Sequence, residues 1–209
     1  MEIGSFSTVS KSSFSVLGYN HPGFGGSTGT PYPANSASTI YSVVQYAIHE
    51  LGFLESDIII YAWSIGGYDA TVASSVFPNL KGLYLDATFD DVMPLAKHVM
   101  PPAIESITTK TIRLTLRLFF KPGLSFNYQN ILSKLFRNIW NLNNSHFLSS
   151  FRGPVTILRR NADEIMQSDP RKVEQNRANF MLIEFIRARY PYLLTEETQK
   201  TLEQYLGTF

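Results

Sequence analysis

A run of β-branched and apolar residues leads directly into a serine and two glycines, and this junction constrains the fold more than any other feature. Residues 57–62 read Asp-Ile-Ile-Ile-Tyr-Ala, and residues 63–67 read Trp-Ser-Ile-Gly-Gly. The run has no polar alternation, which predicts a strand buried on both faces, as in a parallel sheet. Small and apolar residues at 70–76 then predict a helix that Pro78 ends. The junction is therefore a sharp strand-to-helix turn centred on Ser64.

Strand and helix patterns alternate along most of the chain, which predicts an α/β fold with a mostly parallel sheet flanked by helices. Apolar residues at 14–17 predict a short buried strand that ends in a glycine-rich loop, and Asn35 or Ser36 is a candidate N-cap for a helix up to Leu51. The remaining strands are expected at 57–62, 80–85 and 154–158, and the remaining helices at 171–189 and 196–206.

The length of 209 residues suits a single domain. We expect this domain to span 14–206, with a core at 14–92 and 152–206 and residues 1–13 disordered. The stretch at about 93–151 interrupts the alternation with a helical pattern. We expect it to be a cap inserted over the carboxyl edge of the sheet, where open α/β sheets bind ligands.

Composition excludes several kinds of site. The net charge of +1 gives no reason to expect nucleic-acid binding, and the absence of cysteine excludes thiolate nucleophiles and cysteine-type metal sites. No His/Asp/Glu cluster has the spacing of metal ligands, so neither a metal nor another cofactor is expected. The sequence contains no apolar stretch of about 20 residues that could span a bilayer and no signal-peptide pattern.

The small-x-Ser-x-Gly pattern around Ser64 is typical of the nucleophile turn in serine hydrolases of the α/β-hydrolase type. Ala62 takes the place of the usual first glycine, which is acceptable because the strained turn excludes only bulk. The backbone N–H of Ile65 would lie at the helix start, where it could stabilise an oxyanion. The simpler alternative is a Ser-Gly-Gly turn that merely begins a helix.

Two aspartates are candidates for the acid of a catalytic triad. Asp163 follows the strand predicted at 154–158, whereas Asp86 ends the strand before it. Hydrolases of this type place the serine, the acid and the histidine in that order along the chain. We favour Asp163, since a loop acid after the later strand is the commoner arrangement. Asp86 would instead cap the next helix or orient the loop around Ser64.

The general base is missing from its expected place. The four histidines, His21, His49, His98 and His146, all precede Asp163. Without a base, a serine hydroxyl is a weak nucleophile at neutral pH. His21 follows the predicted strand at 14–17 and could reach the site by an unusual route, while His49 fits a helix surface and the other two histidines fall in the cap.

Several segments of the sequence together resemble the abhydrolase-domain-16 family of membrane-associated phosphatidylserine lipases. The similarity runs in order through most of 14–206, and it is carried by the segments 20–24, 26–29, 58–67, 86–91, 159–160 and 163–165. It implies a serine lipase that acts on phosphatidylserine, its lyso form or monoacylglycerols at a cytosol-facing endomembrane surface. Ser64 and Asp163 fall on the family's nucleophile and acid positions.

The chain also departs from the family pattern. The family's base histidine, its membrane-anchoring segment and the strand that supplies a second oxyanion donor have no counterpart here, and residues near 117–136 look inserted. We therefore expect an incomplete chain with weak activity or none.

Two other functions are compatible with parts of the sequence. A protein that keeps the fold without catalysis and binds lipid or another partner is the main rival. The glycines at 23 and 25 superficially resemble a dinucleotide-binding motif, but the third glycine and the later acidic residue are absent. A basic stripe in the cap suggests either contact with anionic lipid or an ordinary solvated helix face, and it comprises Lys110, Arg113, Arg117 and Lys121.

Overall fold

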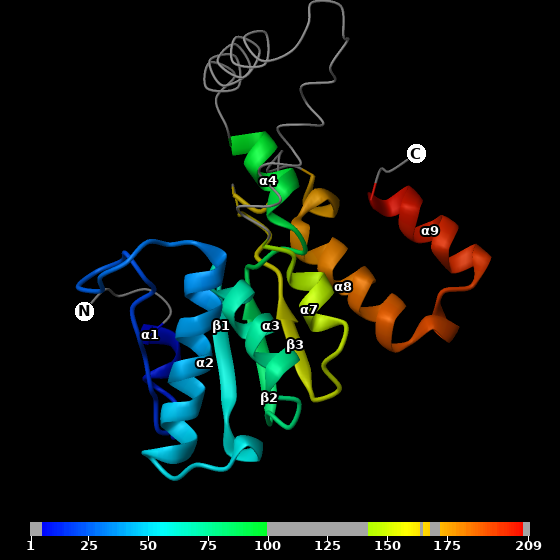
Figure 1. Cartoon of the computed structure of the whole chain (residues 1–209). Helices are drawn as coiled ribbons and strands as arrows, with labels where there is room; N and C mark the ends of the chain where they lie inside the picture. The colour runs from blue at the N-terminus through cyan, green and yellow to red at the C-terminus, as the bar shows by residue number, and fades with distance from the viewer. Residues whose placement is uncertain (1–5, 100–141, 164, 168–171, 207–209) are drawn as a thin grey trace, which may run out of the picture.

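A parallel three-stranded sheet forms the centre of the computed structural model, which describes residues 6–99, 142–163, 165–167 and 172–206. Its strands are β1 (Ile59–Trp63), β2 (Gly82–Asp86) and β3 (Val155–Leu158), arranged in that order. The expected α/β class with a mostly parallel sheet is confirmed for this part of the chain. All three strands point their carboxyl ends toward α4 (Val92–Val99), so the loops that follow them gather at one edge (Figure 1).

Helices cover one face of this sheet. Ala62, Leu83 and Leu85 point to that face and belong to the main hydrophobic core. The helix α3 (Gly66–Val76) packs against β1 and β2, and α2 (Pro33–His49) packs against α3 (Figure 1). From Gly67 to Ser74 every residue of α3 is buried, which explains why this helix consists largely of small side chains.

The opposite face of the sheet is open in the described part of the chain. Alternate residues point to it, and four of them are large apolar side chains that are 39–45% exposed: Ile59, Trp63, Tyr84 and Leu158. The prediction that the strand ending at Ala62 is buried on both faces is therefore wrong. The strand shows no polar alternation because its residues are apolar on both faces, although only one of these faces is covered.

The segment at 14–17 is not a strand, contrary to our prediction. Among the described residues it makes no ladder with β1, and Phe14, Val16 and Leu17 are 67%, 38% and 46% exposed. A short apolar run forms a strand only when a neighbouring strand takes its backbone hydrogen bonds. The short helix α1 (Phe6–Val9) lies within 1–13, where we expected disorder.

Other boundaries shift by a few residues. Helix α2 begins at Pro33 rather than after Asn35 or Ser36, because proline suits the first helical position. The helix expected at 171–189 begins only at Arg177, where Asn176 caps it, and the 3₁₀ turn η2 (Val173–Gln175) precedes it. The remaining elements are the 3₁₀ turns η1 (Glu55–Asp57) and η3 (Pro191–Leu193) and the helices α8 (Arg177–Arg189) and α9 (Glu196–Leu206).

The stretch expected at about 93–151 to form the cap starts next to a bridge whose second residue lies inside that stretch. An isolated antiparallel bridge joins Asp91 to Asn143. The next helix, α7 (Asn144–Leu148), packs against α3, and both Leu148 and Phe151 are 1% exposed in the core. Residues 100–141, including the basic stripe, lie outside the described residues, and the division into core and cap stays a prediction.

Candidate active site

Ser64 occupies the turn between β1 and α3 in a strained backbone conformation. Its φ of 54° lies in the left-handed region, which non-glycine residues rarely adopt. Its N–H donates to the carbonyl oxygen of Asp86 at 2.9 Å, and its own carbonyl oxygen accepts from Gly67 N–H at 3.1 Å. The side chain is partly exposed and makes no hydrogen bond to another described residue. This strand–turn–helix geometry is what a nucleophile position requires.

Gly67 permits the close approach of α3 to the turn that follows β2. A Cβ atom on this glycine would lie 2.0 Å from the Thr88 hydroxyl oxygen, so no side chain fits. Gly66 is less constrained, because a Cβ there would lie 3.9 Å from the Ala62 Cβ atom. The second glycine of the motif therefore serves packing rather than chemistry.

Ile65 directly follows Ser64 at the start of α3. It is the N-cap residue of α3, and no backbone acceptor for its N–H occurs among the described residues. The first amides of a helix are free of intrahelical partners and point along the positive end of the helix dipole. Its assignment as an oxyanion donor stays a prediction, and its side chain is 51% exposed beside Ser64.

Asp86 is fully engaged by other side chains. Arg160 donates to both carboxylate oxygens, at 2.9 Å from Nε and 2.7 Å from Nη2, and the Tyr61 hydroxyl adds a bond of 2.7 Å. Hydrogen bonding from Arg160 lowers the pKa of Asp86, although burial opposes this shift. No described hydrogen bond joins the Asp86 side chain to a helix N-terminus or to Ser64, but the Asp86 carbonyl oxygen does accept from the Ser64 N–H.

Asp163 lies in the loop after β3 and keeps free acceptor capacity. Its Oδ1 atom accepts from the N–H groups of Ile165 at 3.1 Å and Met166 at 2.9 Å, and no described residue donates to Oδ2. The backbone bonds fix the carboxylate without neutralising it. This contrast with Asp86 favours Asp163 as the acid, which stays a prediction because no histidine is bonded to Asp163 among the described residues.

His21 is held by a buried carboxylate that the sequence analysis missed. Its Nδ1 atom lies 3.0 Å from Oδ2 of Asp69, and the Tyr19 hydroxyl donates to the same oxygen at 2.6 Å. Burial, together with the nearby Asp69 carboxylate, raises the pKa of Tyr19 well above its usual range. The sequence signal that could have revealed this pair is Asp69, an acidic residue among the small and apolar side chains of α3. This cluster ties the glycine-rich loop to α3.

Of the other histidines, two have described side chains, and neither of these is bonded to Ser64. His49 ends α2 and is exposed, and His146 is exposed beside Phe147. His98 falls in α4, where its side chain lies outside the described residues. No hydrogen bond joins Ser64 to a histidine within the part of the chain that the structure describes.

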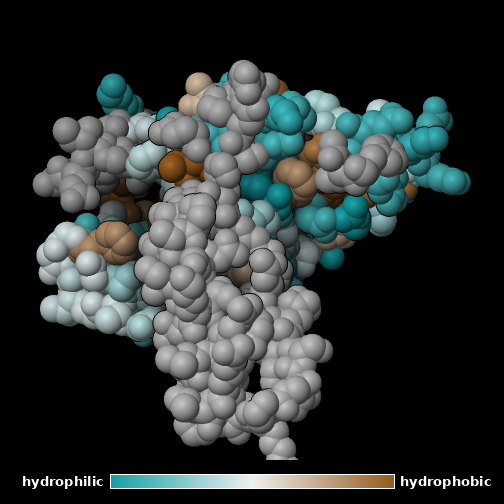
Figure 2. All heavy atoms as spheres, turned by 90° about the horizontal axis from the view of Figure 1, so that it is seen from above, coloured by the Kyte–Doolittle hydropathy of each residue, from teal (hydrophilic) through white to brown (hydrophobic). Residues whose placement is uncertain are grey.

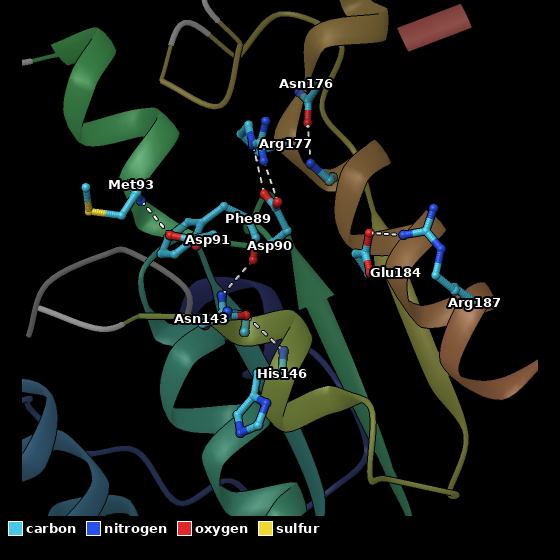
Figure 3. A network of polar contacts seen from close by, with 12 residues as sticks. Phe89, Asp90, Asp91, Met93, Asn143, His146, Asn176, Arg177, Glu184 and Arg187 are labelled. Atoms are coloured by element: carbon cyan, nitrogen blue, oxygen red, sulfur yellow. Dashed lines mark hydrogen bonds and ion pairs between the residues drawn. The ribbon is translucent and has the colours of Figure 1, made fainter. Parts of the chain in front are cut away.

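A second polar network lies at the same edge and was also not predicted. Arg177, at the start of α8, donates from Nε to Asp90 at 2.8 Å and from Nη2 to the other carboxylate oxygen (Figure 3). Burial raises the pKa of Asp90, and the charge of Arg177 counteracts that rise. Asn144 donates to the Phe89 carbonyl oxygen at 2.8 Å, which fixes the loop after β2.

Seen from above, the described residues show apolar and polar surface side by side (Figure 2). No group of three or more metal-ligating side chains occurs within 6–99, 142–163, 165–167 and 172–206. In the same part of the chain no helix is long and apolar enough to cross a membrane.

Comparison with known proteins identifies relatives of nearly the whole chain. No protein-family model matches it, and no solved structure is similar enough to be matched. Phosphatidylserine lipase ABHD16A from Rattus norvegicus and from Homo sapiens are each 42% identical over 206 residues, which is 98% of this chain. An uncharacterised Caenorhabditis elegans protein, F37A4.1, is 34% identical over 199 residues, or 92% of the chain.

The matched region is only part of each relative. The chain spans about a third of the length of the curated lipases, 33%, and 36% of the nematode protein. The expected resemblance to this family is thereby confirmed, and so is the α/β-hydrolase character of the partial fold. By sequence the chain is similar to the phosphatidylserine lipases ABHD16A over nearly its whole length, and it corresponds to about a third of those proteins.

Proposed function

We propose that this chain carries the nucleophile-bearing part of a serine lipase that acts on acyl esters of phosphatidylserine, lysophospholipid or monoacylglycerol. The observation that carries the proposal is the geometry of Ser64, which has a φ of 54° between a core strand and a buried helix. Nothing about a simple helix start requires that strain, whereas a nucleophile turn does. The relatives named phosphatidylserine lipase supply the substrate class.

In the proposed reaction the Ser64 hydroxyl attacks the acyl carbonyl carbon and gives its proton to a histidine base. The carbonyl oxygen becomes an oxyanion that the Ile65 N–H stabilises. Asp163 orients the histidine through its free Oδ2 atom. The intermediate collapses to an acyl-Ser64 ester, and the alcohol leaves with the proton from the base. Water, activated by the same base, then attacks this ester and releases the fatty acid and free Ser64. No histidine follows Asp163 in this chain, so the proposal leaves the histidine base unidentified.

We also propose that the site works at a lipid surface, on a cytosol-facing endomembrane as in the family. Trp63 and Ile65 flank Ser64 in the sequence and are 44% and 51% exposed. Such apolar neighbours favour an acyl chain over a polar substrate.

Covalent labelling with a fluorophosphonate probe tests the proposal. We expect slow labelling of the purified chain that is lost in Ser64→Ala and kept in Ser75→Ala, a matched serine at the far end of α3. Labelling that persists in Ser64→Ala contradicts the proposed nucleophile.

The rival function is a protein that binds lipid without catalysis. The observation that favours it is the absence of a histidine bonded to Ser64 among the described residues. It predicts binding to phosphatidylserine vesicles with no probe labelling at any concentration, so the two measurements together separate the functions.

A further inference from the structure

A polar pocket of about 410 Å³ lies between α7, α8 and the loop that follows β2. The polar side chains that matter for its chemistry come from all three walls: Asp90, Asp91, Ser145, His146, Glu184 and Arg187. Figure 3 shows the two aspartates on the loop, the histidine on α7 and the glutamate–arginine pair on α8. One wall of the pocket is thus part of the carboxyl edge of the sheet, where the turn that carries Ser64 also lies.

Carboxylates outnumber guanidinium groups in and around this pocket. Arg177 donates to both carboxylate oxygens of Asp90, and Arg187 donates to Oε1 of Glu184. Asp91 adds a third carboxylate, whereas the described lining of the pocket includes no further arginine or lysine. With histidine neutral, the local charge is therefore negative at neutral pH, which favours a cationic group over a lone phosphate or carboxylate.

The Ser145 side chain makes an ammonium group the cation that fits best. Its Oγ atom is buried and has no hydrogen-bond partner among the described residues, which is unfavourable unless a bound donor satisfies it. An ammonium group carries three N–H donors and no acceptor, so it can bond to a hydroxyl oxygen and two carboxylates at once. A divalent metal fits less well, because no three metal-ligating side chains converge in the part of the chain that the structure describes.

The pocket lies close enough to Ser64 for one lipid molecule to reach both. The Asp86 carbonyl oxygen accepts from the Ser64 N–H at 2.9 Å. Asp90 follows Asp86 by four residues, and a fully extended chain of four residues spans at most about 14 Å. The connecting loop is held in place, because Thr88 packs against α3. A lipid whose ester lies at Ser64 can therefore extend its head group toward Asp90.

We infer that this pocket binds the ammonium group of a serine-type phospholipid head group and so selects phosphatidylserine or its lyso form over monoacylglycerol. The inference rests on the proposed function and narrows its substrates, since a monoacylglycerol carries no cation. The ammonium group donates to Asp91, Glu184 and the Ser145 hydroxyl oxygen, which are one acceptor from each wall. His146 and Arg187 border the same pocket and supply N–H donors for the carboxylate of the head group.

Vesicle binding tests the pocket separately from catalysis. Phosphatidylcholine vesicles that contain phosphatidylserine are compared with vesicles that contain the same mole fraction of phosphatidylglycerol, which has the same net charge but no ammonium group. We expect the wild-type chain to bind the phosphatidylserine vesicles about fivefold more tightly or better. Soluble glycerophosphoserine should compete for this binding, and it should do so more strongly than ethanolamine.

Two substitutions in the pocket should abolish this preference. Ser145→Ala removes a hydroxyl group that has no partner among the described residues, so the unfolding midpoint in urea should not fall. Asp91→Asn removes the charge but keeps the oxygen that accepts from the Met93 N–H at 2.7 Å. Ser150→Ala and Asp57→Asn are the matched controls and should keep the preference, because both residues are exposed and lie outside the pocket.

Equal binding to the two kinds of vesicle overturns the inference, and so does a preference that survives in both Ser145→Ala and Asp91→Asn. Competition by ethanolamine as strong as that by glycerophosphoserine overturns the assignment to a lipid head group. A lower unfolding midpoint for Ser145→Ala also contradicts the inference, since the hydroxyl group would then stabilise the fold. Probe labelling of Ser64 is measured independently, so failure of the proposed nucleophile and failure of the pocket give different results.

Discussion

Individual side chains at the carboxyl edge decide which carboxylate is available to the proposed chemistry. Arg160 occupies both oxygens of Asp86, and Tyr61 adds a third bond. Among the described residues, Asp163 is held only by backbone N–H groups at one oxygen. To bond to Asp86, a histidine would have to displace Arg160, whereas Oδ2 of Asp163 has no donor among the described residues. This difference is the physical reason to prefer Asp163 as the acid.

Gly67→Ala should destabilise the protein, because the added methyl group would lie 2.0 Å from the Thr88 hydroxyl oxygen. Either α3 or the turn after β2 must then move, which typically costs about 1–3 kcal/mol. Urea unfolding measures the loss. Gly66→Ala is the control, since its new Cβ would have an ordinary contact at 3.9 Å. Equal stabilities for the two variants would show that the approach of α3 to Thr88 is not constrained.

Arg160→Gln should raise the pKa of Asp86 and lower stability at neutral pH. In the wild-type protein the pKa of Asp86 is depressed below its usual 3.8, so the pair stabilises the fold above that pH and loses this effect as pH falls through the lowered value. Because the Arg160 side chain is 54% exposed, solvent screening limits the loss to about 1 kcal/mol. Unfolding compared at pH 7 and pH 3 checks this: a deficit that does not shrink in acid contradicts it.

At the scale of elements, the helix α8 depends on a buried cap. Asn176 is 1% exposed, accepts from Ala178 N–H at 3.0 Å and donates to the Arg160 carbonyl oxygen at 3.2 Å. One residue therefore begins α8 and also supports the loop that carries Arg160 and Asp163. The position of the proposed acid depends on this helix start.

Asn176→Ala should cost about 1–2 kcal/mol, the usual effect of losing a helix cap. Asn176→Asp keeps the cap acceptor and should recover most of that loss. Thermal and urea unfolding of both variants provide the measurement. A larger loss for Asn176→Asp than for Asn176→Ala would show that the bond to the Arg160 carbonyl oxygen, rather than the cap, dominates.

The sequence predicted the elements whose patterns are local. The turn at Ser64, the strands around it and the helix at 196–206 follow from runs and breakers within a few residues. The predictions from the sequence failed where the structure depends on residues far away in the chain. The segment at 14–17 lacks a neighbouring strand, and the partners of Asp86, Asp69 and Asp90 come from 74, 48 and 87 residues away. Periodicity carries no information about such pairs.

At the scale of the whole molecule, no described histidine side chain is hydrogen-bonded to Ser64. We expect the purified chain to hydrolyse a phosphatidylserine or monoacylglycerol substrate several orders of magnitude more slowly than the full-length human relative, the usual effect of a missing triad member. A coupled fatty-acid release assay measures this. Turnover comparable to the relative's that disappears in Ser64→Ala would contradict the expectation and would require a base among the histidines present.

The bridge between Asp91 and Asn143 has a consequence for how such proteins diversify. Since the chain leaves and re-enters the core at one point, the entropy of closing the intervening stretch grows only logarithmically with its length, by about 0.6 kcal/mol per doubling. Insertions in this stretch therefore change the stability of β2, α7 and the core between them very little. Evolution can therefore vary the length of this stretch while the framework formed by β2 and α7 stays the same.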